Sequence, residues 1–181
     1  MARTAPLRRC RGATLVELCA ALAVALTLAG MALPSLKTFR ERQVWRSTSE
    51  ALALDLRLAR AEAVRLNDAV NFRVSNRGQG GCYLLHTGPR EGCDCAGGQA
   101  TCKAAGAFVL HAQWLPAGSA IQLRSNVETL VFLAQQGVVT PTGTIEVTLR
   151  QGDTLRHTVA ITGRVRTCAV GARLGALRRC T

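Results

Sequence analysis

Apolar residues dominate one early stretch of the chain and then recur with a helical period. Residues 13–33 carry Glu17 as their only charge, and about 20 apolar residues suffice to cross a membrane as a helix. Farther along, apolar positions spaced by three or four residues predict an amphipathic helix on a globular domain. These positions are Leu52, Leu56, Ala59, Ala63 and Leu66. Pro34 lies between the two parts and is expected to bend or open the helix, because it has no N–H to donate.

Beyond Asn67 and Asp68, which are expected to end the helix, the apolar pattern changes to a period of two. The segments that alternate in this way are 69–75, 82–87, 107–115, 120–125, 129–137, 144–150 and 156–167. Because no helical segment separates them, they predict an antiparallel sheet with the amphipathic helix covering one face. The fold class expected from the pattern is therefore α+β.

The start of the chain differs from an ordinary secretory signal. Residues 1–12 contain four arginines and no acid, which predicts that this end stays in the cytoplasm. A secretory signal places its small-residue cleavage site after the apolar run, whereas here the small residue, Gly12, precedes it. Cleavage after Gly12 would give Ala13 a free amine and make Glu17 the fifth residue. A carboxylate in lipid needs a partner, and the Ala13 amine of the same or a neighbouring subunit could pair with Glu17. Such pairing would set the axial register of one subunit against the next in a helical assembly.

The stretch G-A-T-L-V-E-L resembles the class III prepilin signal of type IV pilins and type II secretion pseudopilins. The match covers Gly12, Thr14, Leu15, Glu17 and Leu18. It departs from the family at Ala13, often Phe there, and at Cys19, usually aliphatic. The alternative is a plain signal anchor with an incidental acid.

The resemblance implies a pilin-like fold and a single pass through the bacterial inner membrane, with the C-terminal domain in the periplasm. It also implies cleavage by a prepilin peptidase and N-methylation at Gly12 and Ala13, then assembly with other pilins or pseudopilins into a pilus or pseudopilus. The expected parts are a leader (1–12), a membrane and assembly half of the helix (13–35), its amphipathic half (36–67) and a globular β domain (68–181). The last contains a Cys-rich insertion (82–102) and a basic C-terminal tail.

Eight cysteines favour an oxidising compartment. Six remain once Cys10 in the leader and Cys19 in the apolar helix are set aside. The economical pairing joins Cys168 to Cys180 and pairs the other four among themselves, with their connectivity open. Those four are Cys82, Cys93, Cys95 and Cys102. A zinc site is the alternative, but its usual paired C-x2-4-C spacing is missing, so we predict no metal and no cofactor.

The C-terminal tail is basic. The chain has a formal net charge of +12, and no acid follows Asp153. The arginines beyond that point are Arg156, Arg164, Arg166, Arg173, Arg178 and Arg179. On an extended backbone Arg164 and Arg166 would project to one side, where two guanidinium groups suit successive phosphates. Gly163 would let the backbone approach a ligand closely.

This stretch resembles the G-R-x-R element of FimT-like minor pilins, which implies DNA binding during natural transformation. The resemblance assigns that role to Gly163, Arg164 and Arg166, and the acid-free tail extends it to the other arginines. The alternative is a solvated surface strand in a structural GspH-type pseudopilin without a DNA role. His86, His111 and His157 are scattered, with no nearby nucleophile, so the sequence does not predict an enzyme.

Overall fold

A computed structural model describes residues 14–75, 81–95, 98–115, 118–135, 137–150, 152–171 and 177–180. The leader, its cleavage site at Gly12 and Ala13, and Arg173 lie outside these residues. The chain divides into two units, Met1–Arg40 and Glu41–Thr181. The second unit contains both hydrophobic core clusters and all three disulfides of the described residues, so it has the features of a domain that folds independently.

Helix α1 spans Leu15–Leu66. It begins with a cap, because the Thr14 hydroxyl accepts a hydrogen bond from the Glu17 backbone N–H at 3.3 Å. It ends as the sequence predicted: Asn67 adopts a left-handed conformation (φ 50°) and the Asp68 N–H donates to the Ala63 carbonyl, a common way to close a helix. Local chemistry therefore sets both ends.

By length and composition, no single helix in the described part of the chain qualifies as a membrane span. The segments Leu15–Gly30 and Ser35–Leu66 qualify only as a bent pair. Pro34 lies between these segments, among residues whose side chains the structure does not describe. The helix opening expected at Pro34 stays a prediction.

Two antiparallel sheets make up most of the second unit. The five-stranded sheet has the order β5-β2-β1-β7-β8 and the four-stranded sheet the order β11-β10-β9-β6. The strands of the first are β1 (Val70–Ser75), β2 (Gly81–Thr87), β5 (Val109–Leu115), β7 (Thr129–Phe132) and β8 (Val139–Thr140). Those of the second are β6 (Ile121–Ser125), β9 (Gly143–Leu149), β10 (Thr154–Val159) and β11 (Val165–Val170). The sequence-based α+β fold class with an antiparallel sheet is confirmed.

Two predicted strands were too long. The segment 156–167 is not one strand but most of a hairpin, in which β10 and β11 pair from Thr154↔Val170 to Val159↔Val165. A tight turn joins them, closed by the Gly163 N–H donating to the Ala160 carbonyl at 2.8 Å. Likewise β7 stops at Phe132, and a short loop leads into β8 instead of a continuous strand to residue 137.

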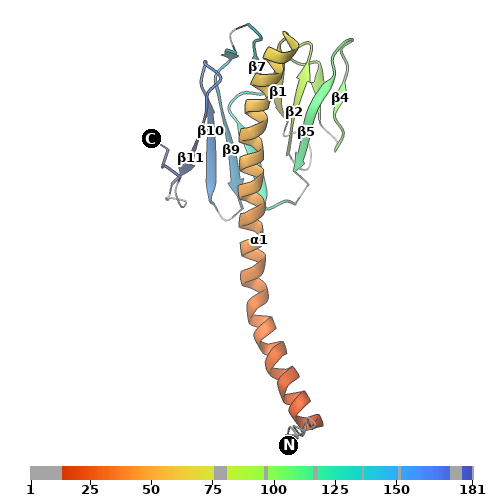
Figure 1. The fold of residues 1–181 in the computed structure, drawn as a ribbon, viewed down its shortest axis with the longest axis vertical. Helices are drawn as coiled ribbons and strands as arrows, with labels where there is room; N and C mark the ends of the chain where they lie inside the picture. Colours follow the sequence, from red (N-terminus) through yellow and green to blue (C-terminus); the bar gives the residue numbers. More distant parts are fainter. Residues whose placement is uncertain are drawn as a thin grey trace, which may run out of the picture. The chain divides into compact units, whose positions relative to one another are not determined.

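The second half of α1 packs against both sheets (Figure 1). Four of the five predicted helix positions, Leu52, Leu56, Ala59 and Ala63, are fully buried, and Leu66 is half-buried at the edge of this core. Hydrogen bonds fix the helix on each side. The Trp45 indole N–H donates to the Val147 carbonyl at 2.9 Å, and the Tyr83 hydroxyl donates to the Asp55 carboxylate at 2.7 Å.

A disulfide-bonded insertion contains the hairpin of β3 (Cys93–Asp94) and β4 (Thr101–Cys102). Disulfides join Cys82 to Cys95 and Cys93 to Cys102, a connectivity that the sequence had left open. The third disulfide joins Cys168 to Cys180, as predicted. Because these sulfur atoms are bonded to one another, they do not form the zinc site considered as the alternative.

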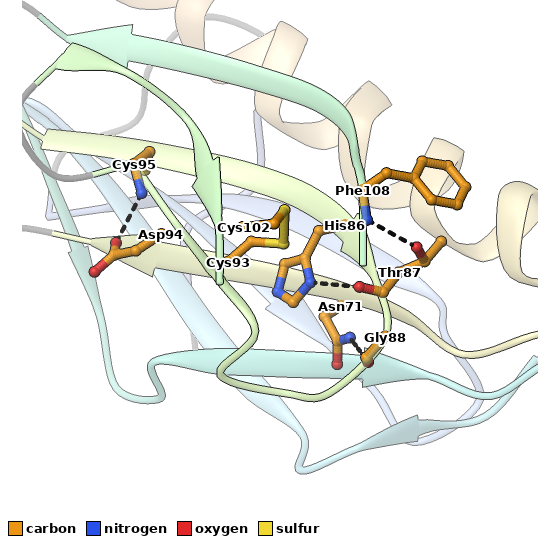
Figure 2. The surroundings of a disulfide bond; sticks show 9 residues. All are labelled: Asn71, His86, Thr87, Gly88, Cys93, Asp94, Cys95, Cys102 and Phe108. Atoms are coloured by element: carbon orange, nitrogen blue, oxygen red, sulfur yellow. Dashed lines mark hydrogen bonds between the residues drawn. A yellow bond between two sulfur atoms is a disulfide. The ribbon is translucent and has the colours of Figure 1, made fainter. Parts of the chain in front are cut away.

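The insertion covers polar side chains on the five-stranded sheet. Figure 2 shows the His86 ring beside the Cys93–Cys102 disulfide, with its Nδ1 bonded to the Thr87 carbonyl at 3.0 Å. Asn71, opposite His86 on β1, donates to the Gly88 carbonyl at 2.9 Å. Burial lowers the pKa of His86. All six residues of β1 are buried, since the helix covers one face and the insertion contributes cover on the other.

Candidate nucleic-acid interface

The β10–β11 hairpin exposes Arg164 and Arg166 on one side. Val165 between them packs against the core, whereas both arginines are exposed. Arg166 lies opposite the exposed Thr158 on β10, and the Arg164 carbonyl accepts the Ala160 N–H at 3.0 Å. Alternation along the strand therefore directs both guanidinium groups away from the core, about 7 Å apart at their backbones.

Gly163 has a packing role that the sequence did not predict. It is buried, with a positive φ of 72°. A Cβ atom at this position would lie 2.7 Å from the Gly137 carbonyl oxygen and 3.0 Å from Cδ of Arg60 on α1. The missing side chain thus lets the turn pack against its own protein. Close approach of a ligand to this face of Gly163 is blocked.

The other predicted arginines differ in their availability. Arg156 forms an ion pair with Glu146 on β9, with both N–O distances at 2.9 Å. Arg179 donates to the Gly171 carbonyl at 2.6 Å, and Arg178 is exposed. Among the residues that the structure describes, no carboxylate forms an ion pair with Arg164, Arg166 or Arg178. Of the predicted arginines that the structure describes, these three have the guanidinium groups most available to an anion.

The end of the chain is attached to β11. Besides the Cys168–Cys180 disulfide, the Ala169 N–H donates to the Arg178 carbonyl and the Cys180 N–H donates to the Ala169 carbonyl, both at 2.9 Å. Residues 177–180 therefore lie beside the last strand, and this holds Arg178 near the hairpin arginines.

The inner face of the hairpin carries a buried polar chain. The Ser49 hydroxyl on α1 contacts Nε2 of His157 at 2.8 Å, and the Thr167 hydroxyl contacts Nδ1 at 2.9 Å. Burial, with a smaller contribution from the Arg57 charge, lowers the pKa of His157 to about 4. The ring is therefore neutral at pH 7 and links the helix to both strands of the hairpin.

His157 is expected to make the free energy of unfolding depend on pH. The pKa of this imidazole in the unfolded chain is about 6.5. Between pH 6.5 and 4 the ring therefore binds a proton in the unfolded state but not in the folded state. Stability is complete above pH 6.5 and falls as the pH drops toward 4, by about 3 kcal/mol. Urea unfolding of Glu41–Thr181 across this range should show the loss, and the His157→Gln variant should show a flatter profile. A His157→Gln variant that keeps the pH profile of the wild type would contradict this assignment.

The other two histidines have structural contacts: His86 is hydrogen-bonded to the Thr87 carbonyl, and His111 Nε2 lies 3.4 Å from the Asp55 carboxylate.

A feature that the sequence did not reveal lies on the outer side of the four-stranded sheet. A shallow groove of about 400 Å³ there is lined by Arg124, Ser125, Asn126, Thr144, Glu146 and Arg156. Arg124 comes from β6, outside the tail on which the sequence analysis concentrated.

Three comparisons bear on this fold. The sequence profile of a family described as type II transport protein GspH matches residues 48–163, and no curated protein matches the chain. The solved structure of the type IV minor pilin FimU of Pseudomonas aeruginosa is similar with a TM-score of 0.50 and 18% identity, covering 70% of this chain and 98% of FimU. The minor pseudopilin EpsH of the Vibrio cholerae type 2 secretion system is similar at a TM-score of 0.46 and 16% identity, covering 70% of this chain and 98% of EpsH.

The family match ends at Gly163, directly before Arg164 and Arg166, the exposed arginines of the β10–β11 hairpin. The basic tail therefore has to be interpreted from its own residues. Because the match includes more than half of the chain, this protein belongs to the GspH family and is a subunit of the minor pilin or pseudopilin type.

Proposed function

We propose that this subunit binds duplex DNA through the outer side of its β10–β11 hairpin, as a minor pilin of a type IV pilus that takes part in DNA uptake. The observation that carries the proposal is the exposure of Arg164 and Arg166 on one side, without an acidic partner in the described part of the chain. Arg178, on the segment attached to β11, adds a third such charge. Guanidinium groups in this arrangement can clasp successive phosphate oxygens.

Contacts of this kind give affinity without sequence preference, because phosphates carry no base information. The outward positions of the two strands hold arginine, threonine, Cys168 and Val170 rather than aromatic residues on which bases stack. Binding is therefore expected to depend on the phosphate backbone and to weaken with salt.

The assembly part of the proposal concerns the start of α1. A prepilin peptidase cleaves after Gly12 at the inner membrane, Ala13 becomes the methylated N-terminus, and Glu17 pairs with the terminal amine of a neighbouring subunit in the filament. Glu17 lies in the first helical turn, where a carboxylate also interacts favourably with the helix dipole. The globular domain is exported to the periplasm.

A purely structural GspH-type subunit of a secretion pseudopilus is the second candidate, and the family match favours it. DNA binding separates the two. For the full chain in uncharged detergent micelles, we expect affinity for a fluorescent duplex to fall as salt rises, with Arg164→Ala/Arg166→Ala reducing the logarithmic salt slope by about 2. The double variant should also lose roughly tenfold in affinity at low salt, equivalent to about 1.4 kcal/mol.

The control for this experiment is Arg42→Ala/Arg65→Ala, which removes two exposed guanidinium groups of α1 that form ion pairs, Arg42 with Asp153 before β10 and Arg65 with Glu62 on α1. It matches the change in net charge but should leave the affinity nearly unchanged. Absence of wild-type binding at low salt, or equal losses in both double variants, would favour the structural subunit.

A further inference from the structure

Strand pairing aligns charged residues across the outer side of the four-stranded sheet. Arg156 on β10 lies opposite Glu146 on β9, and Glu146 lies opposite Arg124 on β6. One row away, Arg166 lies opposite Thr158, and Thr158 lies opposite Thr144. In each strand the alternate residues point into the core, as the burial of Leu155, Val147 and Leu123 shows. The two rows therefore share the face directed away from the helix.

This outer face is strongly basic. Among the described residues it carries Arg124, Arg156, Arg164 and Arg166 against a single acid, Glu146. Glu146 is bonded to Arg156, which leaves Arg124 exposed and without an ion pair in the part of the chain that the structure describes. Outward positions between the arginines are polar, among them Thr144 and Thr158. The charge continues from the hairpin to the opposite edge of the sheet.

The face also has a suitable shape at its far end. The groove of about 400 Å³ is lined by Arg124, Asn126, Thr144 and Arg156, together with the Glu146 carboxylate that is bonded to Arg156. The Asn126 side-chain oxygen accepts the Thr144 N–H at 2.7 Å, so the amide N–H groups of Asn126 remain to donate to a ligand. An anion in this groove would meet donors of the kind that bind phosphate oxygens.

The distances fit an extended polyanion. Neighbouring strands lie about 4.8 Å apart, so β11 and β6, at opposite edges of the four-stranded sheet, are about 14 Å apart. The major groove of B-DNA is about 12 Å wide. Arg166 of β11 and Arg124 of β6 are therefore far enough apart to contact different phosphates of one duplex.

We propose that bound DNA crosses the outer face of the four-stranded sheet, with Arg124 as a second phosphate contact beyond the hairpin and Glu146 as the group that weakens binding. This inference rests on the proposed DNA binding and extends it to residues outside the basic tail. Arg156 contributes to DNA binding only as far as its ion pair with Glu146 leaves its positive charge uncompensated.

The test compares two single variants of the full chain in uncharged detergent micelles, titrated with a fluorescent duplex over a salt series. Arg124→Ala should weaken binding about three- to tenfold at low salt and reduce the salt slope by about 1, whereas Arg124→Lys should keep the slope. Glu146→Gln should strengthen binding and steepen the slope, because it frees Arg156 and removes a negative charge from the face.

Arg57→Ala is the matched control, since it removes one exposed charge from α1 and lies on the other side of the hairpin, at a separate groove with His157. If wild type binds and Arg164→Ala/Arg166→Ala loses affinity as proposed, but Arg124→Ala behaves like Arg57→Ala, this inference is wrong and the proposed function stands. If wild type does not bind DNA, the proposed function itself fails. A weaker complex of Glu146→Gln, at unchanged thermal stability, would also overturn the inference.

Discussion

Gly163→Ala is expected to lower the free energy of unfolding of Glu41–Thr181 by about 2–4 kcal/mol. The left-handed conformation of Gly163 (φ 72°) costs an alanine about 1–2 kcal/mol. The added Cβ would also lie 2.7 Å from the Gly137 carbonyl oxygen. That carbonyl cannot move freely, because the Gly137 N–H is bonded to Leu133 and the Val139 N–H to Ile161. Urea unfolding of the oxidised domain, followed by tryptophan fluorescence, measures the loss.

Gly152→Ala is the control for this prediction. Gly152 also has a positive φ, 98°, but a Cβ there would have no neighbouring atom within 4 Å. The control should therefore show only the conformational cost. Equal destabilisation by the two substitutions would contradict the packing role of Gly163. A Gly163→Ala protein of normal stability that no longer binds DNA would instead support the ligand contact expected from the sequence.

The sequence analysis missed the turn at Gly163, because an alternating pattern of apolar and polar residues can continue through a turn. Inward residues of β10 are Leu155, His157 and Val159, and those of β11 begin with Val165. All have odd numbers, because the turn between Val159 and Val165 leaves the period of two unbroken. The sequence therefore predicted one strand of the correct phase, and only the pairing of β10 with β11 revealed the turn.

Features set by local chemistry were predicted more fully. The end of α1 at Asn67 and the helix face at Leu52, Leu56, Ala59 and Ala63 were read correctly, since spacing and a capping residue determine them. The burial of both faces of β1 was not predicted. It depends on an insertion whose disulfides join Cys82 to Cys95 and Cys93 to Cys102, and four cysteines permit three connectivities.

The residues of the candidate site also differ in how far the sequence could predict their position. Arg164 and Arg166 are two residues apart, so their common side could be read from the sequence. Arg124 is forty residues from Arg164 and joins the same face only because β6 pairs with β9 and β9 with β10. Glu146, which compensates Arg156, also comes from a neighbouring strand. Charge balance across a sheet requires the strand order, which no local pattern supplies.

Glu17→Gln is expected to leave membrane insertion and leader removal intact while reducing incorporation into filaments to about a tenth of wild type or less. An intramembrane charge opposes insertion, so its removal should not hinder that step. Loss of the proposed pairing with a neighbouring amine would cost several kcal/mol in a buried setting, enough for such a reduction. Immunoblots of sheared filaments and membrane fractions measure incorporation, and mass spectrometry of the mature N-terminus measures cleavage.

Two features make this substitution specific to the charge. Glutamine keeps the size of the side chain, and the Thr14 cap is unaffected because its donor is the backbone N–H of residue 17. Glu50→Gln, which removes an exposed acid from the other half of α1, should assemble normally. Wild-type incorporation of Glu17→Gln, or a mature protein that still begins at Met1, would leave the carboxylate without the partner that explains its place in an apolar helix.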